Sequence, residues 1–182
     1  GGNSWFFLTA DYVFGHAMEA ESTKVIKAND GTVLGGVRHP QNTSDFASYL
    51  VRAQSSGAKA IGLANAGNDT INAIKQAVEF GLTAGGQRLV GLILFISDIH
   101  ALGLQNAHGL VLTEGFYWDM NAQSREWSQR FMKRFGKMPT RQQATTYATV
   151  VHYLRAIEKS RSDDSKTVVA DMKAMPMKFF GQ

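Results

Sequence analysis

The chain has 182 residues, of which 44% are apolar, with 18 glycines and 3 prolines, and this composition excludes disordered and fibrous classes. The net charge of +4 is small, and the absence of cysteine excludes disulfides and thiolate metal sites. No run approaches the roughly 18 apolar residues that a membrane-spanning helix needs.

Basic residues are scattered among acidic ones, apart from a short cluster at Arg130, Lys133, Arg134 and Lys137. No aromatic platform on which bases would stack is interleaved with this cluster. We therefore interpret the cluster as the solvated face of a helix, and we expect no nucleic-acid partner.

Apolar strands alternate with helices over the first 113 residues. Residues 4–10 are bulky on both faces, which is typical of a central parallel strand that helices cover on each side. Helical spacing of apolar residues follows at 13–28. The later elements expected, in chain order, are a strand at 32–37, a helix that Thr43 or Ser44 caps and Gly57 ends, a strand at 58–64, a helix at 70–80, a strand at 88–96, a short helix from its cap Ser97 to 106, and a strand at 109–113.

Five strands that alternate with four helices predict right-handed crossovers, and therefore an α/β fold with a Rossmann-like open parallel sheet. The loops after the strands, at 11–14, 39–43, 65–69 and 96–98, then share one edge of the sheet, where a ligand is expected near the switch point. The first loop carries Asp11, Tyr12 and Phe14 where a phosphate-binding protein would carry a glycine-rich loop. This substitution argues against nucleotides.

After Thr113 the pattern changes to three consecutive aromatic residues at 116–118 and then to helices at 122–135, 140–160 and 164–175. The second helix has an apolar stripe formed by Ala144, Tyr147, Ala148, Val151, Leu154 and Ile157. Helices with apolar faces need a surface to cover. They either fold back over the first part or cover a sheet in chain that is not present here, and the abrupt change at 116–119 favours the second interpretation.

Several segments, in this order, are similar to one known family: WFFLTADYVFG, HPQNTSDFASYLVRAQSSGAKAIGLANAGNDT, LVGLILFISD, GLVLTEGFYWD and ATTYATVVHYLRAIE. With them the chain resembles, over nearly its whole length, the type I periplasmic substrate-binding proteins of ABC transporters, in the branched-chain amino-acid (Leu/Ile/Val)-binding-like family. In that family two α/β lobes close on a small ligand. The resemblance implies that residues 1–116 are the second ligand-binding lobe, and that residues 117–182 are a crossover and helices of the first lobe, whose sheet is absent from this chain. It also implies an exported, periplasmic protein whose signal peptide is absent from this chain.

The resemblance implies a ligand site at the turns after the first, third and fourth strands and at the crossover. Leu94 and Ile96 flank the predicted contact in the turn after the fourth strand. For Phe14 and Phe95 the alternative is a place in the core. The predicted ligand-binding residues are Asp11, Tyr12, Phe14, Ala64, Asn65, Ala66, Phe95 and Tyr117, and no catalytic residue, metal ligand or cofactor is expected.

The chain departs from the family's pattern at residues 92–97, LILFIS, where amino-acid binders carry an acidic group that pairs with the ligand's ammonium. An uncompensated ammonium in an apolar site is costly. Either Asp98 or Asp11 supplies the charge or the ligand lacks an amine, and we favour an aromatic or aliphatic carboxylate. The groups that hold its carboxylate would then lie in the missing lobe.

The resemblance implies the solute-binding component of an ABC-type uptake transporter, which binds a small amino acid or carboxylate and delivers it to a membrane permease by hinge closure. The expected partners are the ligand, the permease, and either the missing first lobe or a second copy of the chain. A sensor domain of a regulator or receptor with the same fold is the alternative.

An enzyme is less favoured, because G-x-S-x-G, Walker A and G-x-G-x-x-G motifs are absent. The 5 histidines form no tight ligand pattern, so a metal is not expected. Ser97, Asp98 and His100 resemble a catalytic triad, but we interpret them as a helix start with Ser97 as its cap.

Overall fold

The computed structural model describes residues 2–180, which divide into two compact units after Thr113. Each unit is described by itself. The predicted boundary follows Phe116, and the assignment of the two parts to different lobes stays a prediction.

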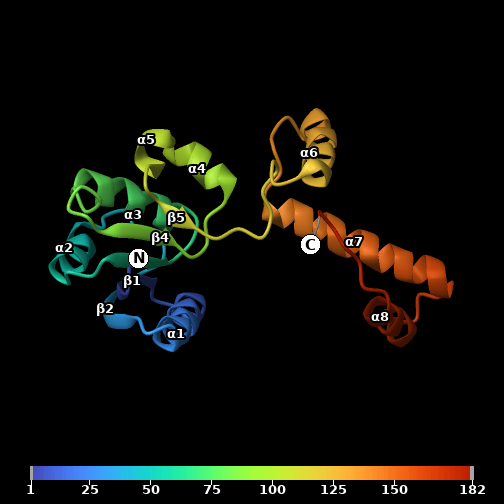
Figure 1. Cartoon of the computed structure of the whole chain (residues 1–182), viewed down its shortest axis with the longest axis horizontal. Helices are drawn as coiled ribbons and strands as arrows, with labels where there is room; N and C mark the ends of the chain where they lie inside the picture. Colours follow the sequence, from blue (N-terminus) through green and yellow to red (C-terminus); the bar gives the residue numbers. More distant parts are fainter. Residues whose placement is uncertain (1, 181–182) are drawn as a thin grey trace. The chain divides into compact units, whose positions relative to one another are not determined.

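The first unit is an open five-stranded parallel sheet with helices on both faces (Figure 1), which confirms the predicted fold class. The strand order is β2-β1-β3-β4-β5. The elements are β1 (Ser4–Ala10), α1 (Val13–Ala28), β2 (Thr32–His39), α2 (Ala47–Ser55), β3 (Ala60–Ala64), α3 (Asn68–Glu79), β4 (Arg88–Gly91), α4 (Ile96–Leu102), α5 (Leu104–Ala107) and β5 (Val111–Leu112).

Strand β1 lies between β2 and β3, so the chain leaves β1 at the point where the strand order reverses. Ala10 at the end of β1 is in register with His39 at the end of β2, and Thr9 is in register with Ala64 at the end of β3. Because the strands are parallel, their exit loops meet at one edge of the sheet, which we call the carboxyl edge.

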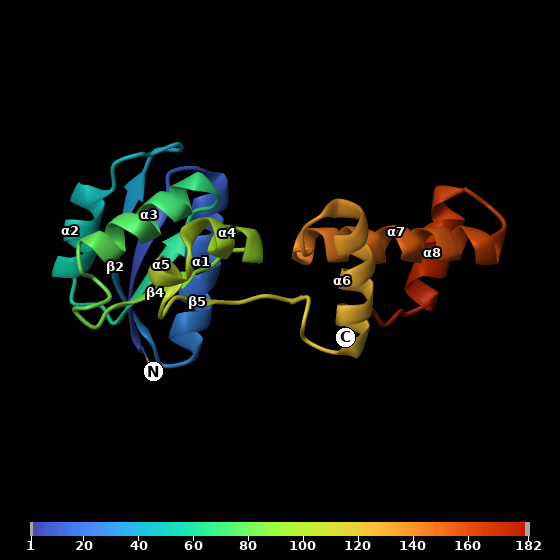
Figure 2. The ribbon, with the colours of Figure 1, turned by 90° about the horizontal axis from the view of Figure 1, so that it is seen from above.

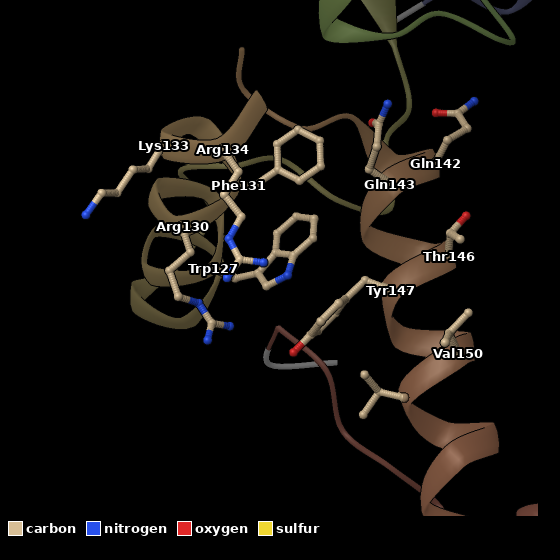
Figure 3. Close-up of a pocket in the computed structure, with 11 residues that line it drawn as sticks. Trp127, Arg130, Phe131, Lys133, Arg134, Gln142, Gln143, Thr146, Tyr147 and Val150 are labelled. Carbon is tan, nitrogen blue, oxygen red and sulfur yellow. The ribbon is translucent and has the colours of Figure 1, made fainter. Parts of the chain in front are cut away.

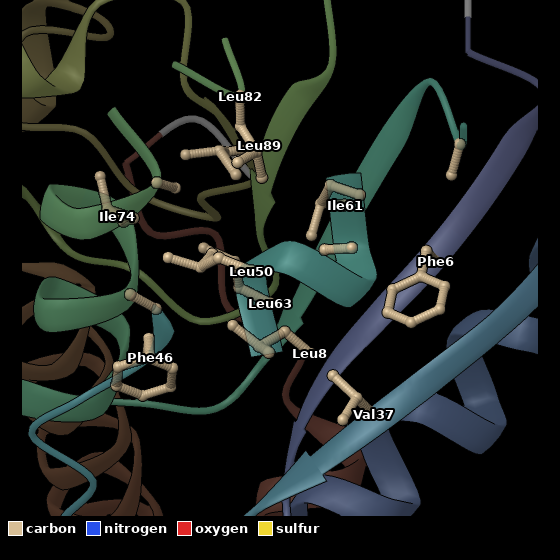
Figure 4. Packing of buried hydrophobic residues seen from close by; sticks show 14 of the residues in the cluster. Phe6, Leu8, Val37, Phe46, Leu50, Ile61, Leu63, Ile74, Leu82 and Leu89 are labelled. Carbon is tan, nitrogen blue, oxygen red and sulfur yellow. The ribbon is translucent and has the colours of Figure 1, made fainter. Parts of the chain in front are cut away.

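The main core lies between the sheet and helices α2 and α3. Phe6 and Leu8 of β1 and Ile61 of β3 pack there against Phe46, at the start of α2, and Ile74 of α3 (Figure 4). Helix α1 contacts the strands β1, β2 and β3, and Figure 1 shows it on the side of the sheet away from α3, whereas the two helices overlap in Figure 2. Alternate strand residues thus face two helical layers, as expected for a central parallel strand.

The ring of Phe7 is buried over the middle of β3. A Cβ atom at Gly62 would lie 2.6 Å from this ring, so the glycine leaves the space that the ring occupies. This packing explains the small residues of β3.

Two predicted elements around β4 were wrong. The strand predicted at 88–96 ends at Gly91. Strand β5 pairs only with Val90 and Gly91. The chain then turns, and the buried side chain of Leu94 packs back onto Gly91. The predicted cap Ser97 lies inside α4, whose N-cap is Phe95. The carboxylate of Asp98 accepts a hydrogen bond from the Phe95 backbone N–H at 2.9 Å, which fixes this helix start.

The single helix predicted up to residue 106 is interrupted at Gly103, which has a positive φ of 78°. The start of α2 was also predicted wrongly. Thr43 and Ser44 precede it, its N-cap is Phe46, and no side chain of the N-cap residue supplies the capping bond.

The second unit contains α6 (Ala122–Phe135), α7 (Arg141–Ser160) and α8 (Ser165–Ala174), and α8 packs beside α7. Its small core consists of Phe116, Trp127 and Ala144 with partly buried aromatic residues around them. Asn121 caps α6 by accepting a hydrogen bond from the Ser124 backbone N–H at 2.9 Å. At the start of α8, the backbone N–H of Thr167 donates to Asp164 and lowers the pKa of that carboxyl.

The apolar stripe predicted on α7 is only partly buried. Ala144 and Ala156 are the buried residues of this 20-residue helix, whereas Tyr147 is 38% and Leu154 is 54% exposed. Over residues 2–180 no helix combines the length and the apolar character needed to cross a membrane. Part of the stripe thus stays exposed although α8 packs beside α7 and Trp127 of α6 lies against Tyr147.

A substitution at Gly15 tests the packing of α1 on the carboxyl edge. A Cβ atom at Gly15 would lie 2.1 Å from the Ala10 carbonyl oxygen and 3.0 Å from that of Ala64. We expect Gly15→Ala to lower the free energy of unfolding by about 1–3 kcal/mol, the usual cost of overpacking, in chemical denaturation followed by circular dichroism.

Gly85→Ala is the matched control, because its nearest contact would be an ordinary 3.4 Å. The control should change the free energy of unfolding by no more than about 0.5 kcal/mol. Equal effects of the two substitutions would contradict the close approach of α1.

Candidate functional site

The turn after β1, residues 11–14, presents two aromatic rings at the carboxyl edge. The Asp11 backbone N–H donates to the His39 carbonyl at 2.7 Å, and the Tyr12 N–H donates to that of Ala10 at 2.8 Å. Tyr12 is the extended N-cap of α1, so the strand passes into the helix almost at once. The rings of Tyr12 and Phe14 lie 5.7 Å apart, and Tyr12 is 37% exposed. Such rings offer rigid area for an apolar ligand and a hydroxyl at one end.

The carboxylate of Asp11, in the same turn, already has basic neighbours. His16 Nε2 donates to Asp11 Oδ1 at 2.7 Å, and an Arg38 guanidinium nitrogen lies 4.0 Å from the same oxygen. All three side chains are partly exposed. The negative charge of Asp11 is therefore partly compensated within the protein.

The loops after β2 and β3 are joined by buried polar side chains. Asn65 Nδ2 donates to His39 Nε2 at 3.0 Å, and Thr70 Oγ1 donates to Asn65 Oδ1 at 2.7 Å. His39 Nδ1 donates to the Pro40 carbonyl at 2.8 Å. These three side chains are almost completely buried, so both ends of the Asn65 carboxamide are used inside the protein.

Helix α3 holds the backbone of the β2 loop, residues 40–46, through side chains on one helical face. Gln76 accepts from the Phe46 N–H at 2.7 Å and donates to the Ser44 carbonyl at 2.8 Å. Asp69 accepts from the Asn42 N–H at 3.2 Å. The spacing of Asp69 and Gln76 is seven residues, or about two helical turns, so both face the loop. The β2 and β3 loops are thus held together.

The structure brings six of the eight predicted ligand residues to adjacent loops. Asp11, Tyr12 and Phe14 share the β1 turn, and the β3 loop follows the neighbouring strand. In the β3 loop Ala64 and Asn65 are buried and Ala66 is half-buried. Phe95 is half-buried at the start of α4.

Tyr117 lies in the second unit, where it is exposed and its ring lies 5.5 Å from that of Trp118. Sequence reasoning assigned no role to His39, Asp69 and Gln76. The polar loop after β2 and the periodic polar residues of α3 were the available signals for them.

Within residues 2–180, no three His, Asp or Glu side chains are grouped so that they could hold a metal ion. The triad-like Ser97, Asp98 and His100 form a helix start, as expected, although the cap differs. The Asp98 carboxylate is used by the Phe95 N–H.

A second surface lies in the helical unit, between α6 and α7, and we call it the α6–α7 groove. Its volume is about 1180 Å³. Figure 3 shows Trp127 and Phe131 projecting from α6 toward Tyr147 of α7, and the rings of Trp127 and Tyr147 lie 5.3 Å apart. Val150 and Val151 extend the apolar lining along α7. The lining also includes polar and basic side chains, which are Arg130, Lys133, Arg134, Gln142, Gln143 and Thr146.

Comparison with known proteins gives one family for both units. A family model described as periplasmic binding protein matches residues 1–181. No curated protein matches the chain. A periplasmic binding protein from Burkholderia mallei is 52% identical, with a TM-score of 0.92 over 99% of this chain and 48% of that one.

Two further solved structures share the fold. A branched-chain amino acid ABC transporter periplasmic ligand-binding protein from Burkholderia xenovorans is 36% identical, with a TM-score of 0.89 over 98% of this chain and 48% of that one. A solute-binding protein of an ABC transporter from R. palustris, in complex with 4-hydroxybenzoate, is 23% identical, with a TM-score of 0.84 over 94% of this chain and 48% of that one. The chain therefore spans about half the length of these relatives.

The link between α3 and the β2 loop is tested by Gln76→Ala. The substitution removes the acceptor of the buried Phe46 N–H, and an unsatisfied buried donor costs about 1–3 kcal/mol. We expect the free energy of unfolding to fall by this amount and the Phe46 amide to exchange faster with solvent. Gln54→Ala, at an exposed position of α2, is the control and should leave both unchanged. An unaltered exchange rate at Phe46 in Gln76→Ala would show that the bond does not hold the loop.

Proposed function

The chain belongs to the periplasmic binding protein family, and from this we propose that it forms half of the solute-binding component of an ABC-type uptake transporter in the periplasm. The observation that carries the proposal is the aromatic pair at the switch point of the sheet, in which Tyr12 is exposed and Phe14 is half-buried. Ligands of open α/β sheets bind at this place. The relatives are described as binding proteins of transporters, and we accordingly propose binding without catalysis.

The proposed mechanism is hinge closure. The β1 turn and β3 loop form one wall of the ligand site, and a second lobe forms the other. A ligand that contacts both walls stabilises the closed state by its higher affinity for that state. The closed protein is then the form that a membrane permease recognises. Asp11, Tyr12, Phe14, Ala66, Phe95 and Tyr117 are the proposed contacts, with Ala64 and Asn65 as the base of the β3 loop.

We propose that residues 1–116 are one lobe and that residues 117–182 are a crossover and helices that cover the other. Three observations support this division. The chain covers 48% of its Burkholderia relatives, Tyr147 and Leu154 of the α7 stripe are exposed, and aromatic and aliphatic side chains form part of the α6–α7 groove. The occupant of the groove would be the sheet-bearing half that those relatives have and this chain does not span.

The proposed ligand is an aromatic or aliphatic carboxylate without an amine. The two carboxylates considered as partners of a ligand ammonium already have partners, because Asp11 accepts from His16 and Asp98 accepts from the Phe95 N–H. A ligand ammonium would have to compete for them, and a buried ammonium without an acidic partner is costly. The R. palustris structure supports the chemistry only in that the same fold holds 4-hydroxybenzoate.

A ligand screen tests this proposal in a two-lobed protein, made by replacing the matching half of the B. mallei relative with this chain. We expect 4-hydroxybenzoate or a related acid to raise the melting temperature, since a ligand at 100 times its dissociation constant stabilises by about 2.7 kcal/mol. Tyr12→Ala should weaken binding about tenfold or more, whereas Tyr49→Phe, on α2, should not. Stabilisation by leucine alone would refute the carboxylate proposal.

The proposed occupant of the α6–α7 groove is tested by mixing the chain with the complementary half of the B. mallei relative and measuring sedimentation. We expect a 1:1 complex, which Val150→Asp should weaken at least tenfold because it replaces an exposed apolar side chain of the groove with a charged one. Val169→Asp, at a similarly exposed position of α8, is the matched control. A complex that both variants form equally well, or a homodimer that excludes the added half, would contradict the proposal.

A further inference from the structure

His39 is a buried titratable side chain that the proposed ligand contacts do not include. It is the last residue of β2, and its ring packs edge-on against Phe46 at 4.9 Å and Tyr49 at 5.9 Å. Its two ring nitrogens both have polar partners, the Pro40 carbonyl and the Asn65 carboxamide. The buried imidazole is therefore fully hydrogen-bonded, as buried polar groups usually are, and its partners are the β2 and β3 loops.

The partners fix the direction of each hydrogen bond. A carbonyl oxygen can only accept, so His39 Nδ1 carries the proton that is donated to Pro40. In the neutral ring Nε2 is then an acceptor, and it receives a hydrogen of Asn65 Nδ2. This leaves Asn65 Oδ1 to accept from Thr70 Oγ1. With the Asn65 carboxamide oriented in this way, the bonds require the neutral imidazole that is protonated at Nδ1.

The β3 loop, residues 65–67, needs such an anchor. Gly67 has φ 60° and ψ −135°, a conformation in which a side chain would be strained, so the loop is held in an unusual backbone shape. Asn65, two residues earlier, is bonded to His39 at the end of β2 and to Thr70 at the start of α3. The half-buried Ala66 lies between these fixed points.

We propose that His39 is a positioning residue for the ligand-facing edge, because its neutral ring accepts from Asn65 and so holds the β3 loop beside the β1 turn. Asn65 then serves the site as an internal anchor, and the loop presents Ala66 and backbone atoms to the ligand. The inference rests on the proposed function only in calling this edge ligand-facing.

The test uses the whole chain and needs no ligand, so its failure is distinct from failure of the proposed function. In His39→Leu, amides 65–70 should exchange with solvent about tenfold faster or more than in the unaltered chain, because the buried carboxamide loses its acceptor. His39→Gln supplies a carbonyl acceptor and should restore slow exchange. Leu50→Ala, a core change in α2, is the control and should raise exchange without selecting this loop.

A second measurement keeps the inference testable even where His39→Leu fails to fold. A long-range proton–nitrogen spectrum of the unaltered chain near neutral pH should show His39 protonated at Nδ1 and unprotonated at Nε2. A proton on Nε2 would overturn the proposal. So would exchange at residues 65–70 that rises equally in Leu50→Ala, or a failure of His39→Gln to restore it.

Discussion

The pairing of β1 with β2 on one side and β3 on the other is the constraint on which the candidate site depends. Because the strands are parallel and in register, Ala10, His39 and Ala64 end at one level, and three exit loops meet there. Gly15 allows the first turn of α1 to approach the carbonyls at these strand ends. The position of Tyr12 and Phe14 follows from this packing rather than from contacts that the two rings make themselves.

The polar groups at the carboxyl edge divide into two sets with different consequences. His39, Asn65, Thr70 and the polar face of α3 are buried or bonded within the protein, and they make the β2 and β3 loops one structural block. The β1 turn carries the exposed aromatic rings and a partly compensated carboxylate. A preorganised wall of this kind reduces the ordering that a ligand has to impose when it binds.

Local sequence patterns predicted the elements that depend on local signals. The bounds of β1, α1 and α6 agree with the prediction, because β1 is a continuous bulky run, the two helices have helical periodicity, and each element has a polar or glycine stop. The helix start at α2 was missed because its buried Phe46 N–H is satisfied by Gln76, 30 residues away. The length of β4 was overestimated because Leu94 is apolar both in a strand and in a turn that folds back into the core.

The candidate site was likewise predictable only in the parts that follow from the order of the elements and from the family resemblance. The order of strands and helices placed the β1 turn and the β3 loop at one edge, and the resemblance supplied the residues. What the sequence did not reveal is that the Asn65 carboxamide bonds to His39 and Thr70, since that depends on how two loops meet in space. The exposure of part of the α7 stripe was not predictable for a similar reason. A periodic apolar face indicates that a helix packs against something, but it does not identify the partner.

The central claim is that a ligand binds at the carboxyl edge of the first unit. The most direct measurement is a map of backbone amide shifts in the two-lobed protein as 4-hydroxybenzoate is added. The account predicts that the largest changes fall on residues 11–15 and 64–67. Changes confined to the α6–α7 groove or to the opposite edge of the sheet, with residues 11–15 unaffected, would contradict it.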